Sequence, residues 1–514
     1  MSNNISRREF IKMMAALPLL KVAADVSASP SQAFFQQNTG APNILVIVFD
    51  ALSATNVSLL GYYRQNMPNL AKFAEKSTVY HRHYAGGSFT SPGTATLLTG
   101  TYPWTSKAYH LYATVAKEYE KRNIFNLLAG KNYTRMTFTH NNLASMLLHQ
   151  FEGDLEVLKE TKELCLFNNH LLANGIFRND YDAAYLGERT IARGEPGKDI
   201  QLPSSLFLSA AHRVWREWKK GDVVFQYRDS FPRGLPSANA GPFVYLLEDA
   251  IDWVRDSITT NENPFLGYFH FLPPHEPYNT RKEFVRVFRD GWAPISKPEH
   301  VFTEGHSEKY LQQKRRWYDE YILYVDSEFG RLVDSLEQQG FMENTNIIFT
   351  SDHGEMFERG ISEHVTPTLF DPLSHIPLVI HYAGQENRED IHTPTSAADV
   401  LPTVSTMVGQ EPPEWSDGRV LPRTSDQKTE GDRNIFIMDA KSNPKNGPIV
   451  KGTIAMVRDN HKLIYYRGYD GFDNEYEMYD LVNDPEEMED LYSESNTLAG
   501  DLRVELLSRL DEVK

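Results

Sequence analysis

Four side chains of this sequence suit the coordination of one divalent cation. Asp50 and the pair Asp352 and His353 each follow a run of apolar residues, and Thr90 lies between them in the chain. Burying a carboxylate is costly unless a cation or hydrogen bonds compensate for it. Two carboxylates, an imidazole and a hydroxyl favour Zn²⁺ or Mn²⁺, with Ca²⁺, which prefers oxygen ligands, as the alternative. A second interpretation is that each acidic residue only caps the loop or helix that follows it.

A bound cation would give a hydroxyl such as that of Thr90 a chemical role. The pKa of an aliphatic hydroxyl is too high for attack at neutral pH, and coordination to a cation lowers that pKa and orients the oxygen. The same charge would offset the charge on a transferring phosphoryl or sulfuryl group. The four residue types therefore indicate ester chemistry at phosphorus or sulfur.

Two histidines are candidates for the rim of such a site. His275 lies in the proline-rich segment 272–278, just past an apolar run, and His364 follows the Asp352 pair along the chain. An imidazole at either place could hold an ester oxygen or protonate a leaving group. Either could instead be a loop histidine whose ring is satisfied by backbone groups. For His140 we favour a structural role.

The elements that must position these residues are apolar runs alternating with helical patterns. Continuous apolar runs are typical of parallel strands buried on both faces, and they cover residues 43–50, 264–272, 346–352 and 376–382. Helical patterns lie at 68–75, at 246–257 and before Gly340. This alternation predicts an α/β fold with a mostly parallel sheet between helices, whose site lies beyond the carboxyl ends of the strands.

The composition divides the chain into a catalytic domain and a smaller C-terminal part. Residues 29–41 are predicted to be a linker, and residues 42–411 the catalytic domain, with a polar, irregular insertion at 150–245 that shapes the substrate site. The turn-rich residues 412–514 are predicted to form a small α+β subdomain that ends in a helix. The aromatic residues, Trp317 among them, are expected to serve packing.

The first residues resemble an export signal. Arg7 and Arg8 lie in a twin-arginine pattern, an apolar stretch follows at 13–20, and small residues end at Ala28. We predict a signal peptide at 1–28, export by the twin-arginine machinery and a periplasmic or extracellular location. The apolar stretch is too short to span a bilayer, so no transmembrane helix is expected in the mature chain. The alternative is a basic, amphipathic N-terminus.

The charge of the chain limits its partners. A net charge of −17 over 514 residues argues against nucleic acid, which would need a basic face. An anionic ester remains compatible, because a bound dication reverses the local field. The single cysteine, Cys165, excludes an internal disulfide.

Residues 88–103 resemble the nucleophile segment of the sulfatase family, within the alkaline-phosphatase-like superfamily. The family pattern is Cys-x-Pro-x-Arg before a Leu-Leu-Thr-Gly-x-Tyr-Pro tail, and alignment on the tail places Thr90 on the cysteine and Thr94 on the arginine. Further segments resemble the family in the same order: 42–50, 264–278, 325–332, 344–355, 399–403 and 479–486.

The resemblance implies the roles of the site residues. Metal ligands would be Asp50, Thr90, Asp352 and His353, Thr90 would also be the nucleophile, and His275 and His364 would line the substrate oxygens. The cofactor would be one divalent ion, and the substrate an anionic ester, with a glycan or a lipid headgroup as candidate carriers.

The departures from the family pattern bear on the reaction. Ala51 replaces the second of two adjacent aspartates, and Thr90 cannot form the formylglycine that sulfatases make from cysteine. A threonine ester of sulfate would turn over slowly, because the elimination open to a hydrated aldehyde is missing. We therefore predict an exported, metal-dependent hydrolase of sulfate or phosphate esters that favours phosphoesters.

One alternative is a phosphoryl transferase of the phosphoethanolamine or glycerophosphate type that acts on a glycan or lipid. The other is a catalytically degenerate protein that binds anionic glycans.

Overall fold

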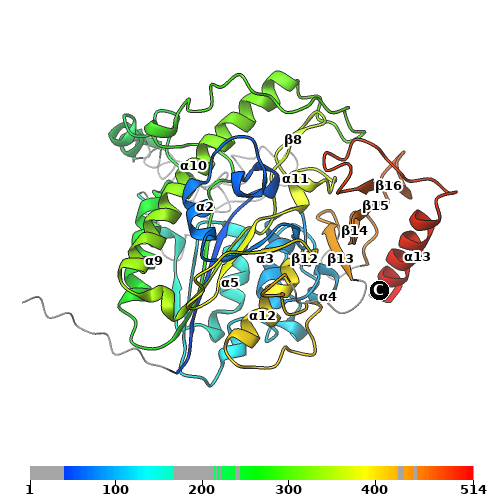
Figure 1. Ribbon diagram of the computed structural model, residues 1–514. Coiled ribbons are helices and arrows are strands. Elements are labelled where there is room, and N and C mark those ends of the chain that lie inside the picture. Colours follow the sequence, from blue (N-terminus) through cyan, green and yellow to red (C-terminus); the bar gives the residue numbers. More distant parts are fainter. Residues whose placement is uncertain are drawn as a thin grey trace, which may run out of the picture. The chain divides into compact units, whose positions relative to one another are not determined.

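In the computed structural model (Figure 1), the apolar run after Pro42 forms the central strand β1 (Asn43–Phe49). Its side chains alternate between two hydrophobic clusters. Leu45, Ile47 and Phe49 belong to one cluster, and the intervening side chains, among them Val46 and Val48, belong to the other. A strand buried on both faces needs an unbroken apolar sequence, which is what this segment supplies.

The structure describes residues 40–166, 214, 217–219, 221–237, 243–425, 433–443 and 448–512. The chain divides into two units, Met1–Gly40 and Ala41–Lys514, and the described helices and strands all belong to the second. The predicted signal peptide 1–28, the linker as far as residue 39 and residues 167–213 of the predicted insertion lie outside the described residues.

β1 lies within an eight-stranded sheet of order β11-β2-β10-β7-β1-β6-β4-β5. The other strands are β2 (Thr78–Tyr80), β4 (Thr134–Thr139), β5 (Val157–Lys159), β6 (Phe265–Phe271), β7 (Thr345–Thr350), β10 (Leu378–His381) and β11 (Glu389–Ile391). All neighbouring pairs are parallel except the two that β10 makes with β7 and β2. The predicted mostly parallel α/β sheet is therefore confirmed.

Helices cover both faces of the sheet (Figure 1). The cluster that contains Phe49 also contains buried residues of α2 (Pro68–Ala74), α9 (Leu247–Thr259) and α10 (Glu308–Gln338). The cluster on the other face contains residues of α3 (Thr90–Thr99), α5 (Asn142–Gln150) and α12 (Val400–Met407). Among the described residues, no helix is long and apolar enough to cross a membrane.

A long-range cap fixes the start of α2. Pro68 occupies the first turn, where its missing N–H costs nothing. The carboxylate of Asp326, on α10, accepts hydrogen bonds from the backbone N–H groups of Asn69 at 2.9 Å and Leu70 at 2.8 Å. The helix that follows β1 is thus anchored to the longest helix of the layer.

The C-terminal region is the expected α+β structure. Its antiparallel sheet consists of β13 (Asn434–Asp439), β14 (Gly452–Arg458), β15 (His461–Arg467) and β16 (Glu475–Asp480). Helix α13 (Thr497–Glu512) packs Leu502 and Leu506 into the same cluster as Ile454 and Met456 of this sheet. Short pairs β3 (His83–Tyr84) with β12 (Thr395–Ser396), and β8 (Phe357–Glu358) with β9 (Ile361–Ser362), lie outside the main sheets, as do the short helices α4 (Pro103–Ser106) and α11 (Asp371–Ser374).

A buried lysine joins the C-terminal sheet to helix α11. Lys462 on β15 is fully buried, and its Nζ lies 2.7 Å from Asp371 Oδ1 and 2.5 Å from Glu487 Oε1. Lys462 also donates to the carbonyl of Leu369 at 3.1 Å. Removal of the ammonium would leave two carboxylates without their counter-charge in a dry interior.

We expect Lys462→Met to lower the free energy of unfolding by about 3 kcal/mol or more, because breaking a buried ion cluster strands its remaining charges. Urea unfolding followed by circular dichroism measures the change. The matched control is Lys131→Met at an exposed position, which should shift the free energy by less than about 0.5 kcal/mol. Equal effects of the two substitutions would contradict the structural role of Lys462.

Candidate active site

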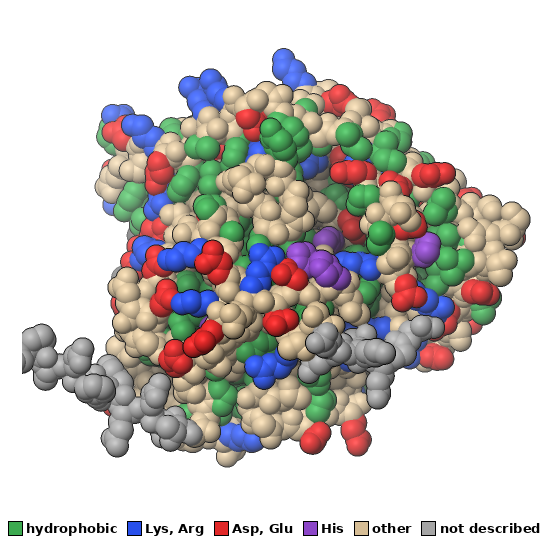
Figure 2. Space-filling model, in the orientation of Figure 1, with side chains coloured by type: hydrophobic (Ala, Val, Ile, Leu, Met, Phe, Trp, Pro, Cys, Tyr) green, Lys and Arg blue, Asp and Glu red, His purple; other side chains and the backbone are tan. Residues whose placement is uncertain are grey.

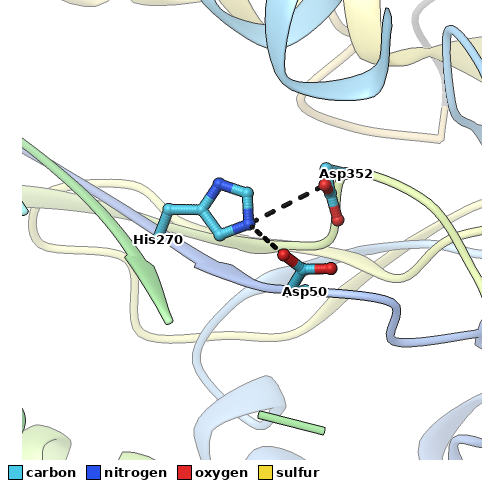
Figure 3. Close-up of side chains that lie close together, drawn as sticks. All are labelled: Asp50, His270 and Asp352. Carbon is cyan, nitrogen blue, oxygen red and sulfur yellow. Dashed lines mark hydrogen bonds and ion pairs between the residues drawn. The ribbon is translucent and has the colours of Figure 1, made fainter. Parts of the chain in front are cut away.

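Three buried side chains meet at the carboxyl ends of adjacent strands. Asp50 follows β1, Asp352 follows β7, and His270 lies near the end of β6 (Figure 3). His270 Nε2 lies 3.1 Å from Asp50 Oδ2 and 3.7 Å from Asp352 Oδ2, and one ligand atom from each residue lies within 4.8 Å of the others. The strand register brings them together, because Val48 of β1 is level with both His270 and Thr350.

His353 completes the cluster. Its Nε2 lies 3.4 Å from Asp50 Oδ1 and 3.7 Å from Asp352 Oδ2. Its Nδ1–H donates to the carbonyl of Gly354 at 2.9 Å, which fixes the tautomer and turns Nε2 toward the carboxylates, as in protein metal sites. Asp50 Oδ1 and His353 Nε2 are buried without a hydrogen-bond partner among the described residues. Buried polar atoms of this kind normally have a partner, so the donor set fits a divalent cation.

The electrostatics of the cluster also call for a positive charge. Burial tends to raise the pKa of Asp50, but the adjacent imidazoles of His270 and His353 outweigh it and hold that pKa well below its usual range. Burial and the charge of Asp50 raise the pKa of Asp352. Burial tends to lower the pKa of His353, whereas Asp352 and Asp50 outweigh it and raise that pKa to about 9. Without a cation, a proton on His353 offsets part of the charge of the two carboxylates.

The predicted nucleophile is linked to this cluster through Asn141. The Nδ2 of Asn141 donates to Thr90 Oγ1 at 3.1 Å and to Asp50 Oδ2. The Oδ1 of Asn141 accepts from the backbone N–H groups of Leu143 at 2.7 Å and Ala144 at 3.3 Å, which caps α5. The cap fixes the amide, so the donor side of Asn141 must face the site. Sequence reasoning had placed no ligand or catalytic role on this residue.

Helix α3 brings Thr90 to the carboxylates. Thr90 is the first residue of α3, where backbone N–H groups and the helix dipole favour a negative charge. A Cβ on Gly93 would lie 2.2 Å from the backbone oxygen of Asp352, so only glycine permits this approach. Thr94, which the resemblance aligned with an arginine, lies with Oγ1 3.5 Å from Asp352 Oδ2.

The C-terminal sheet braces the segment just before Thr90. Met438 of β13 donates its backbone N–H to the carbonyl of Gly86 at 3.1 Å. Ser88 donates its hydroxyl to Asp439 Oδ2 at 2.9 Å. The nucleophile segment is therefore held from both sides, by the main sheet and by the C-terminal region.

The structure brings His275 and His364 to the same place as His353. The ring centroids of His364 and His353 are 4.5 Å apart, and those of His275 and His364 are 4.7 Å apart. His364 Nδ1 lies 2.9 Å from Glu355 Oε1, and Tyr278 donates its hydroxyl to Glu355 Oε2 at 3.2 Å. Figure 2 shows histidine side chains at the surface near the middle of one face, beside both acidic and basic groups.

His140 takes no part in the cluster of metal-ligating atoms. Its ring stacks on Tyr245 with centroids 3.8 Å apart, and burial lowers its pKa to about 3. A neutral imidazole packed against an aromatic ring fits the structural role that the sequence favoured.

His270 is the ligand candidate that sequence reasoning missed. It lies inside the apolar run that forms β6, where every residue is buried. The available signal was the residue type, because a lone imidazole in a strand buried on both faces needs a polar partner. What the sequence does not give is the register that aims this imidazole at Asp50.

The backbone of Ala51 lies beside the metal-ligating cluster. Its φ is 58°, a left-handed conformation that is uncommon for a residue other than glycine. The backbone N–H of Ala51 lies 3.3 Å from Asp352 Oδ1, and its carbonyl accepts from the hydroxyl of Tyr318 at 2.6 Å. The backbone at this position therefore supports Asp352 without an additional carboxylate.

The chain belongs to the sulfatase family of ester hydrolases. The family profile "Sulfatase" matches residues 42–161 and 227–410. A second profile, "N-sulphoglucosamine sulphohydrolase, C-terminal", matches residues 367–514.

Individual relatives are distant. A choline-sulfatase from Rhizobium meliloti is 24% identical over 415 residues, 74% of this chain and 70% of that protein. Arylsulfatase K from Bos taurus is 25% identical over 355 residues, 60% of this chain and 63% of that protein. The crystal structure of a phosphonate monoester hydrolase from Agrobacterium radiobacter superposes with a TM-score of 0.65 at 19% identity, covering 92% of this chain and 96% of that one. This likeness in structure confirms the alkaline-phosphatase-like fold.

We expect His270→Gln and Asp352→Asn each to weaken the retention of a divalent ion by about tenfold or more, since each removes a donor from the cluster. Metal content after dialysis, measured by plasma mass spectrometry, is the readout. His83→Gln is the control, because His83 is equally buried but contacts Thr395 instead. Unchanged metal content in His270→Gln would remove His270 from the ligand set.

Proposed function

We propose that the protein is an exported, metal-dependent hydrolase that cleaves phosphoesters through Thr90, with sulfate esters as the second substrate class. The observation that carries the proposal is the shared amide of Asn141, which donates to both Thr90 Oγ1 and Asp50 Oδ2. The threonine hydroxyl thus lies beside the cluster of buried carboxylates and imidazoles.

Asp50, Asp352, His353 and His270 are the residues that would hold the metal, and Thr90 is proposed as a further ligand. A divalent cation bound there would lower the pKa of the hydroxyl and offset the charge of the ester oxygens. The choice of Zn²⁺ or Mn²⁺ rests on the imidazole content of this set.

The chain's own groups favour an anionic oxygen on Thr90. The N–H of Asn141 donates to Thr90 Oγ1, and a hydrogen bond to the charged form lowers a pKa. The start of α3 adds a favourable backbone dipole. After loss of its proton to solvent, Thr90 Oγ1 attacks phosphorus, and the bond from phosphorus to the leaving oxygen breaks. Water then attacks the phosphothreonine, releases the phosphate product and regenerates the hydroxyl.

His364 is proposed to protonate the leaving oxygen. Glu355 contacts its Nδ1, so Nε2 is the nitrogen that can face the substrate. Burial, followed by the charges of His353 and His275, holds the pKa of His364 well below its usual range. The imidazole is therefore neutral in the free protein, and His364 acts as the acid only after the negative charge of a bound ester raises that pKa and the ring takes up a proton. His275, whose Nδ1–H donates to the carbonyl of Glu276 at 2.9 Å, is proposed to hold an ester oxygen.

The preference for phosphorus follows from the nucleophile. Thr90 stands where sulfatases carry the cysteine that becomes formylglycine, and a threonine ester has no elimination route for its release. A phosphothreonine can be released by attack of water at phosphorus. Export by the twin-arginine pathway and an anionic glycan or lipid headgroup as carrier of the ester belong to the same proposal.

We expect Thr90→Ala to reduce turnover of a chromogenic phosphodiester by about a thousandfold or more, as loss of a nucleophile does in other enzymes. Wild-type protein should carry on Thr90, in mass spectra after rapid quenching, a phosphoryl group that keeps the remaining ester substituent of the diester, and should turn over sulfate esters more slowly. The control is Ser91→Ala, the next residue of α3, whose buried hydroxyl has no hydrogen-bond partner among the described residues. Near-normal turnover in Thr90→Ala would refute the mechanism, and product transferred to an added alcohol would favour a transferase.

We expect the effect of His364→Gln to depend on the leaving group. With an alkyl ester, turnover should fall about a hundredfold, because the leaving oxygen then lacks its proton donor. With a nitrophenyl ester the fall should be small, and Glu355→Gln should show the same pattern. The control is the exposed His392→Gln. An equal loss with both esters would argue against His364 as the acid.

A further inference from the structure

A cavity lined in large part by arginines contains none of the metal-ligating residues in the described part of its wall. Its volume is about 490 Å³, within the roughly 300–1,000 Å³ typical of small-molecule sites. Four of its lining residues are arginines: Arg233, Arg286, Arg289 and Arg316. Among the described residues of its wall, Glu320 is the only carboxylate. Such a concentration of positive charge is unusual in a chain with a net charge of −17.

The guanidinium of Arg233 is fixed by its contacts and keeps one nitrogen without a hydrogen-bond partner in the described part of the chain. Its Nη2 pairs with Glu320 Oε2 at 2.5 Å, and its Cζ lies 5.3 Å from the ring centroid of Trp317. The backbone N–H of Arg286 also donates to Glu320, so this carboxylate is fixed in turn. Arg233 Nη1 is buried and has no hydrogen-bond partner among the described residues. A pre-oriented guanidinium with one unused edge is well suited to an oxyanion.

The other arginines are not neutralised within the cavity. No carboxylate of the described residues pairs with the side chains of Arg286 or Arg289, and Arg316 donates to the side chain of Gln313 at 3.1 Å. Like charges around one cavity repel, and this repulsion is relieved when an anion enters. The arrangement is therefore more favourable with a ligand than without one.

Aromatic rings provide an apolar surface at the same cavity. Trp317, which the sequence assigned to packing, is only half-buried and lines the wall together with Phe288. The guanidinium of Arg64 links Phe288 to Trp292, on which the exposed ring of Tyr63 stacks with centroids 5.0 Å apart. Flat apolar rings beside fixed guanidinium groups suit a ligand with an apolar face and anionic substituents.

The chain passes from the candidate active site to this cavity, but α10 presents different faces to the two places. The segment that leaves the site after His275 passes Asn279, whose Nδ2 donates to the carbonyl of Leu235 at 3.0 Å, and continues to Arg286. On α10, the cavity residues Gln313, Arg316, Trp317 and Glu320 share one face of the helix. Tyr318, whose hydroxyl supports Ala51 beside Asp50, lies on the opposite face. The cavity is therefore separate from the candidate active site.

We propose that this cavity is an accessory site, separate from the Thr90 site, that binds the sulfate or phosphate ester group of an anionic carbohydrate. Arg233, Arg286 and Arg289 bind the ester oxygens, and Trp317 contacts the sugar ring. This assignment does not depend on the proposed function, because no step at Thr90 enters it.

The test measures binding, so that it does not depend on turnover. Full-length wild-type protein is titrated calorimetrically with glucose 6-sulfate, glucose 6-phosphate and inorganic sulfate. Arg233→Gln and the double variant Arg286→Gln/Arg289→Gln should bind the sugar esters about tenfold more weakly or worse, the loss expected for charge-assisted hydrogen bonds. The matched control is Arg388→Gln, which removes the same charge from an exposed position where Arg388 pairs with Asp390.

The outcomes separate this proposal from the proposed function. Weaker binding in the arginine variants, with normal binding in the control, supports the cavity even if Thr90→Ala leaves turnover intact. Equal binding in all variants, an equal loss in the control, or no binding to wild-type protein would overturn it. Inorganic sulfate that binds as tightly as glucose 6-sulfate would overturn the assignment to a carbohydrate.

Discussion

The repulsion between two buried carboxylates is the constraint on which the rest of the site depends. Asp50 and Asp352 are both fully buried, and they follow adjacent parallel strands whose register places them side by side. In a low-dielectric interior, two such charges cannot both persist without compensation. The imidazoles of His270 and His353, the amide of Asn141 and the start of α3 all direct positive charge or dipoles at this point. A divalent cation is the species that this arrangement would accommodate best.

Compensation of this kind requires side chains with fixed orientations. His353, His275 and His364 each have Nδ1 held by a neighbouring carbonyl or carboxylate, at 2.9 Å in all three cases. The three rings therefore keep one orientation, which removes an ordering cost from the reaction. Asn141 is fixed in the same way by its role as the cap of α5. The site is thus built before any ligand arrives.

The C-terminal sheet helps to fix the orientation of the site residues and also stabilises the fold. β13 contacts the segment that precedes Thr90, while Lys462 on β15 joins Asp371 and Glu487 in one buried ion cluster. The C-terminal region, which the sequence predicted to be a separate small subdomain, therefore supports the segment of the proposed nucleophile. The predicted boundary at residue 412 marks a change in composition, whereas residues 41–514 form a single unit in the structure.

The sequence by itself predicted four strands of the main sheet, β1, β6, β7 and β10, three of the helices, α2, α9 and α10, and part of the candidate site. An unbroken apolar run is typical of a strand buried on both faces, so β1, β6 and β7 could be predicted from the residue types alone. Asp50 and Asp352 follow β1 and β7, so they could be predicted to lie at the same edge of the sheet. His270 and Asn141 could not, because an imidazole inside a strand and a capping amide become site residues only through strand register and helix placement. The arginine cavity likewise depends on tertiary structure, since Arg233, Arg286 and Arg316 come from separate segments that meet only when the chain after β6 crosses α10. Local sequence determines which face of an element is apolar, but only packing decides which polar groups share a volume.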